Sequence, residues 1–154
     1  MVVYCFKVAL DHKKQIYRNI EILGSQTLDD FHHVIFSAFD RYDDHPYSFY
    51  LTRKATRSER TRFNSPEYTL MPSDSFQFRT GKKEHGTTNT KIATLLMKPK
   101  EKMYYLFDFG DQWWHEITLL SVVESNRMVT YPMITKRVGE SPEQYPDFGD
   151  IEED

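Results

Sequence analysis

The stretch YYLFDFGDQWWHEITLL, residues 104–120, contains two strand-like segments on either side of a tight turn. Aromatic and β-branched residues dominate both flanks, and the small polar residues of GDQ separate them, so we expect a β-hairpin. Gly110 is expected to supply the positive φ that the turn needs. Asp108 and Asp111 are expected to accept hydrogen bonds from the backbone N–H groups of that turn.

The four residues DFGD occur a second time, at 147–150. No strand-like text flanks this copy, which lies in a carboxylate-rich terminal stretch. We therefore interpret the second copy as a coincidence and the first as the meaningful one. Neither is a kinase metal motif, because the sequence lacks the accompanying glycine-rich loop, strand lysine and catalytic loop.

The first fifty residues alternate between strand and helix signals. VVYCFKVAL and KQIYRNIEIL are two apolar runs joined by a short polar turn, which predicts another hairpin. Ser25 or Thr27 is expected to cap a helix at about 27–39, whose apolar residues recur at helical spacing. YSFYL, residues 47–51, predicts the next strand, and residues 90–97 predict a second, shorter helix.

These signals together predict one fold class. We expect a single α+β domain with a mixed or mainly antiparallel sheet and a β-β-α-β, β-grasp-like start. One main helix is expected to pack on this sheet, and a second short helix to follow.

Length and composition limit the classes of protein that fit. A chain of 154 residues with 39% hydrophobic residues is sufficient for one packed core. Its one cysteine, Cys5, excludes an internal disulfide framework. No apolar run approaches the roughly 20 residues that a membrane helix needs, and no signal peptide is evident. We expect a cytoplasmic protein without a membrane partner.

Charge is unevenly distributed along the chain, whose formal net charge is −3. Residues 140–154 contain seven carboxylates and no Lys or Arg, whereas the middle of the chain is basic. We expect residues 1–139 to form the domain, with a mobile basic loop at about 52–89. Residues 140–154 are expected to form an acidic tail that is partly docked or disordered.

The hairpin residues FDFGDQWWHEITL resemble the signature of the plasmid pRiA open-reading-frame-three-like family, also met as a passenger protein of transposable elements. The resemblance extends over about residues 3–51 and 90–120. It places His32 and His45 on family histidines. The Gly-Trp pair that follows the first helix in the family is replaced here by Asp40 and Arg41. The resemblance implies an association with mobile elements and names no activity.

The hairpin and its neighbours are the first candidate functional residues. They are Asp108, Asp111, Trp113, His115, His45 and His32. Carboxylates beside imidazoles are a ligand set for a divalent metal, with Asp108, Asp111 and His115 as candidates. The alternative is a turn held by aspartates, with a core tryptophan and a hydrogen-bonded histidine. We predict no cofactor, and we keep a divalent metal as the alternative.

The basic loop supplies the second set of candidates. These residues are Arg53, Lys54, Arg57, Arg60, Arg62, Lys82 and Lys83. Basic side chains with aromatic residues nearby neutralise phosphates and stack bases, but a solvated loop has the same composition. We expect a binding or accessory module with a nucleic-acid or protein partner. We favour a protein that is not an enzyme. The alternative is a metal-dependent enzyme that acts on nucleic acid or another phosphate ester.

Overall fold

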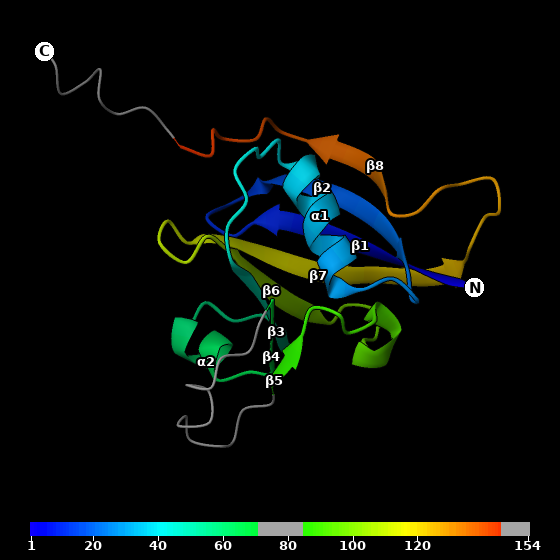
Figure 1. The fold of residues 1–154 in the computed structure, drawn as a ribbon, viewed down its shortest axis with the longest axis horizontal. Helices are drawn as coiled ribbons and strands as arrows, with labels where there is room; N and C mark the ends of the chain where they lie inside the picture. The colour runs from blue at the N-terminus through cyan, green and yellow to red at the C-terminus, as the bar shows by residue number, and fades with distance from the viewer. Residues whose placement is uncertain (71–84, 146–154) are drawn as a thin grey trace, which may run out of the picture.

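The computed structural model describes residues 1–70 and 85–145, and Figure 1 shows how their strands form one continuous sheet. In this part of the chain eight strands lie in the order β5-β4-β3-β6-β7-β1-β2-β8. All neighbouring pairs are antiparallel except β4 and β5. The strands are β1 (Val2–Leu10), β2 (Lys13–Leu23), β3 (Tyr47–Arg53), β4 (Glu67–Thr69), β5 (His85–Thr87), β6 (Lys102–Phe107), β7 (Trp113–Glu124) and β8 (Met133–Val138).

Two short helices accompany the described part of the sheet. Helix α1 (Leu28–Ala38) begins at Thr27, whose hydroxyl accepts a hydrogen bond from the backbone N–H of Asp30, while the Asp30 carboxylate accepts one from the Thr27 N–H. This reciprocal pair is a capping box, and it satisfies two N–H groups that the first turn would leave unpaired. Helix α2 (Glu59–Phe63) follows β3 and begins at Ser58.

The predicted α+β fold class is wrong. The described residues are about 45% strand and about 15% helix, in a mixed sheet of eight strands with two helices. The molecule is therefore mainly sheet, and its 11-residue helix α1 is a minor element on one face rather than the main helix of an α+β domain. The error has a physical cause, because strands such as β4 and β5 span only three residues each and carry no periodic pattern. Residues 90–97 contain only a 3₁₀ turn, Ile92–Leu95.

Apolar clusters of unequal size lie on the two faces of the sheet. On the α1 face, Phe31 lies with its ring centroid 4.9 Å from that of Phe6 and 5.8 Å from that of Phe49. The opposite face has a smaller cluster of buried residues, against which Phe63 of α2 packs: Tyr50, Tyr104, Leu106 and Trp114. In Figure 1, α1 lies over β1 and β2, whereas α2 lies beside β3. The strands of the second face beyond this cluster are therefore left without a helix in the described part of the chain.

The β6–β7 turn contains the first DFGD, and its backbone differs from the prediction. Gly110 does not have a positive φ; Asp108, with φ of 63°, and Gln112, with φ of 55°, adopt the left-handed conformation. Asp108 makes this possible because its Oδ1 accepts hydrogen bonds from the N–H groups of Gly110 (3.1 Å) and Asp111 (3.3 Å). Aspartate tolerates this conformation when its side chain bonds locally.

Candidate functional site

His115 is fully buried, and both of its ring nitrogens are engaged. Its Nε2 lies 2.9 Å from Nη2 of Arg41, and its Nδ1 lies 3.2 Å from the backbone oxygen of Tyr105. A guanidinium can only donate, so Nε2 accepts and Nδ1 carries the proton. Burial and the neighbouring charge of Arg41 hold the pKa of His115 well below its ordinary value. His115 is therefore a neutral, hydrogen-bonded core residue.

His32 reaches the same tyrosine from α1. Its Nδ1 lies 2.6 Å from the hydroxyl of Tyr105, and its Nε2 lies 3.1 Å from Oδ1 of Asp44. The carboxylate accepts, so Nε2 carries the proton and Nδ1 accepts the tyrosine hydroxyl proton. The ring stacks flat on Tyr47, with centroids 3.7 Å apart, and burial lowers the pKa of His32 to about 4. Tyr105 thus connects both predicted histidines.

Asp108 and His45 also come together, at the tip of the same hairpin. Oδ2 of Asp108 lies 3.6 Å from Nε2 of His45. The same imidazole nitrogen contacts the hydroxyl of Tyr145, which donates to Asp43 at 2.8 Å. The preceding residue, Gln144, accepts hydrogen bonds from two backbone N–H groups of the 42–43 segment. Residues 144–145 are therefore docked against the loop before β3.

The predicted metal ligands do not form a metal centre in the described part of the chain. Among those residues, no group of three or more His, Cys, Asp or Glu side chains is placed to hold a metal ion. Asp111 is exposed, and the two nitrogens of His115 already hold hydrogen bonds.

Trp113 lies between two other groups, with its ring 5.3 Å from the guanidinium carbon of Arg41 and 5.9 Å from the ring of His12.

Arg41 was not singled out from the sequence, yet it is the most unusual residue of this network. Its guanidinium is 8% exposed and lies over the rings of Phe39, Phe107 and Trp113, at 5.0–5.4 Å. Burial lowers its pKa to about 10, and Nη1 has no hydrogen-bond partner among residues 1–70 and 85–145. The sequence signal was the replacement of the family's tryptophan by Arg41, because the guanidinium lies among aromatic rings as an indole would.

The predicted basic residues separate into three groups. Arg62 is buried, holds Asp11 through two bonds of 2.9 and 3.2 Å, and lies over the ring of Tyr104. Arg53 bonds Glu101 and the backbone oxygen of Leu95. The exposed members are Lys54, Arg57 and Arg60. Lys82 and Lys83 lie outside the described residues. Arg62 and Arg53 therefore make contacts within the fold, whereas Lys54, Arg57 and Arg60 are exposed to a partner.

The sheet itself carries basic side chains that the sequence did not reveal. The strand register places five polar side chains next to one another on five consecutive strands, from β6 to β8: Lys102, Thr118, Lys7, Asn19 and Lys136. We call this set the lysine row. Alternation along each strand directs it to the face opposite α1, since the neighbours of Lys7, Phe6 and Val8, are core residues. Strands about 4.8 Å apart give the row a length of about 19 Å.

Further charged groups border the lysine row. Glu116 lies beside it and is held by Lys14 at 3.1 Å and Lys102 at 3.5 Å. A hollow of about 200 Å³ lies between Lys14, Glu116 and Arg57, beside the residues that precede α2. Tyr17 lies on the same face, with its ring centroid 4.4 Å from Nζ of Lys7 and 5.8 Å from Nζ of Lys136.

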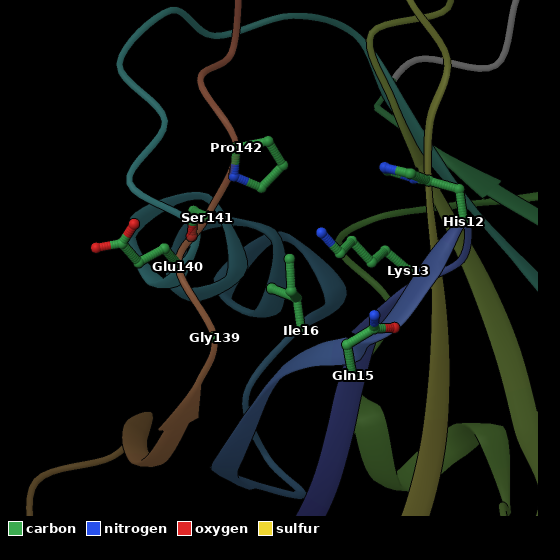
Figure 2. Close-up of a pocket in the computed structure, with 8 residues that line it drawn as sticks. All are labelled: His12, Lys13, Gln15, Ile16, Gly139, Glu140, Ser141 and Pro142. Carbon is green, nitrogen blue, oxygen red and sulfur yellow. The ribbon is translucent and has the colours of Figure 1, made fainter.

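Two larger hollows open elsewhere. One of about 700 Å³ separates the β1–β2 turn from the segment after β8. Figure 2 shows His12 and Lys13 facing Pro142 across it, while the Glu140 carboxylate points away. Another, of about 450 Å³, is lined by residues that include His32, His45 and Asp44. None of the predicted candidate residues lines the first hollow, whereas two of them line the second.

Comparison with known proteins gives a family and a fold. A model of the family described as plasmid pRiA4b ORF-3-like protein matches residues 2–153. No curated protein matches this chain. A crystal structure of a protein of unknown function from Methanosarcina mazei Go1, MM3350, superposes with a TM-score of 0.71 and 21% sequence identity. The match covers 93% of this chain and 73% of that one. In the described residues no helix has the length and apolar character needed to span a membrane.

Proposed function

This chain belongs to the plasmid pRiA4b ORF-3-like protein family, and on that premise we propose that it is a nucleic-acid-binding module. In this proposal the phosphate backbone of the nucleic acid binds to the sheet face opposite α1. The observation that carries the proposal is the lysine row, whose register places three lysines on one face of five consecutive strands. Lysines neutralise phosphates and release their counterions, which supplies most of the sequence-independent affinity for nucleic acid.

The spacing of the lysine row favours a long anion over a small one. Successive lysines lie two strands apart, which corresponds to about 10 Å. A polymer of phosphates can contact all three lysines along this length, whereas a small anion reaches only part of it. The ammonium groups of Lys7 and Lys136 lie over the Tyr17 ring. Each ammonium group can therefore leave its weak contact with the ring and bind a phosphate instead.

Exposed basic side chains are also present near the lysine row, on the side of α2. Arg57 and Arg60 are exposed, and Arg57 lines the hollow that also contacts Lys14. Glu116 and Glu21 are opposing charges on this face, and contacts with Lys14 and Lys102 compensate Glu116. A backbone that follows the row can therefore continue along the exposed arginines.

A salt titration tests the proposal. Binding of a labelled oligonucleotide would be measured by fluorescence anisotropy for wild-type protein and for a Lys7→Gln, Lys136→Gln double variant. A matched double variant, Lys91→Gln with Lys98→Gln, removes the same charge from exposed lysines outside the row. For a single strand, the slope of log affinity against log salt should fall in magnitude by about 0.7 for each lost phosphate contact.

We expect the row variant to lose about 1.4 in slope and the matched variant to retain the wild-type slope. Absence of binding at low salt by the wild-type chain would overturn the proposal. Equal losses in the two double variants would also overturn it, because they would show a response to net charge alone.

A further inference from the structure

Tyr17 is an aromatic residue whose ring lies beside two lysines of the row, Lys7 and Lys136. It occupies the middle of β2, where it is directly opposite Ala9 of β1 and Val138 of β8. Its ring is half-buried. Neither cross-strand neighbour has a side chain large enough to cover a phenol ring, and the ammonium groups of Lys7 and Lys136 lie over that ring.

Lys7 and Lys136 approach this ring from the two strands that flank β2. Lysine stems are flexible, and each ammonium can rotate from the ring toward a neighbouring anion. A nucleotide on this face therefore meets an aromatic ring for its base and two cations for its phosphates. These are the two components of single-strand recognition, namely a stacking surface and a basic track.

We propose that the nucleic acid bound on this face is single-stranded, with one base stacked on Tyr17 and the adjoining phosphates held by Lys7 and Lys136. This inference rests on the proposed function and specifies its substrate. In a duplex the faces of the bases are already stacked on one another, so Tyr17 has no base face to contact. A single strand exposes each base face to an aromatic ring.

Substitution of Tyr17 separates stacking from charge. Affinities of Tyr17→Ala and Tyr17→Phe would be measured for an oligothymidine single strand and for a duplex of mixed sequence at one low salt concentration. We expect Tyr17→Ala to weaken single-strand binding about tenfold, the effect of losing one base–aromatic stack. Tyr17→Phe keeps the ring and should bind as the wild type does, and the duplex affinity should be unchanged in both variants.

The salt slope distinguishes this inference from the proposed function. Tyr17→Ala removes no charge, so its slope for the single strand should equal that of the wild type. If Tyr17→Ala binds single strands as tightly as wild type while the salt-dependent binding persists, the stacking inference fails and the lysine row stands. Equal weakening for single strand and duplex also overturns it. No wild-type binding to either probe overturns the proposed function itself. Thermal melts of both variants check that they are folded.

Discussion

Nη2 of Arg41 donates a hydrogen bond of 2.9 Å to Nε2 of His115. The acceptor role fixes the imidazole in its neutral form with the proton on Nδ1, which donates to the backbone of Tyr105. The histidine of the hairpin signature therefore orders a buried guanidinium that has no carboxylate partner in the part of the chain that the structure describes. A general base or metal ligand needs a free nitrogen, and His115 has none in this arrangement.

Stability should fall in mild acid because two buried histidines are neutral in the folded protein. Burial lowers the pKa of His32 to about 4 and holds that of His115 well below its ordinary value, whereas an unfolded chain has histidine pKa values near 6.5. The unfolded state therefore binds more protons below about pH 6.5. The free energy of unfolding should be intact above that pH and fall toward about pH 4, by up to roughly 1.4 kcal/mol per pH unit for each histidine.

Denaturant melts between pH 7.5 and 4.5 measure this slope, and two glutamine variants assign it. His32→Gln should flatten the pH dependence, because it removes one of the two titrations. His33→Gln is the comparison on the adjacent, exposed residue, and it should change the slope less than His32→Gln does, because His33 acts on His32 only through its charge. A wild-type stability that is constant from pH 6.5 to 4.5 would contradict the neutral assignment.

The two aspartates of the hairpin turn should differ in their contribution to stability. Asp108 is buried and accepts two backbone hydrogen bonds, so Asp108→Ala should lower the free energy of unfolding by about 1–2 kcal/mol. Asp111 is exposed, and Asp111→Ala should change it by less than about 0.5 kcal/mol. Asp150, in the second DFGD, lies outside the described residues, and we expect Asp150→Asn to be neutral.

Elemental analysis of tag-free protein accompanies the comparison of the two aspartates. A stoichiometric divalent metal that is lost in Asp111→Asn would contradict the structural interpretation and restore the metal-dependent alternative. A large destabilisation by Asp150→Asn would show that the second DFGD is not a coincidence.

Two arginines that are two positions apart should behave in opposite ways. Arg62 is buried against Asp11 and Tyr104. Arg62→Ala should therefore lower the free energy of unfolding by about 3 kcal/mol. This value is at the lower end of the range for breaking a buried ion pair, because Asp11 remains partly exposed. Arg60 is exposed, and Arg60→Ala should leave stability within about 0.5 kcal/mol. Chemical denaturation measures both, and the prediction fails if the two variants lose similar stability.

The sequence by itself determined the local features of this protein. The alternating aromatic and β-branched residues on either side of a short polar joint were sufficient to locate the β1–β2 and β6–β7 hairpins. Thr27 was identified as a candidate helix cap from the sequence, because a capping hydrogen bond reaches only to the residue three positions later. The family also followed from the sequence, because the hairpin signature is a contiguous run. Each of these signals spans about twenty residues or fewer.

Only the tertiary structure decided the rest, because the physical causes are contacts between distant segments. β4 and β5 are strands because a neighbouring ladder satisfies their backbone groups, and their own sequence does not predict them. Nothing in the sequence distinguishes Arg62, which meets Asp11 across 51 positions, from the exposed Arg60. The lysine row joins side chains from five strands through their register, and a shift of one residue would turn any of them to the opposite face. The surface proposed to bind nucleic acid is therefore a product of strand pairing.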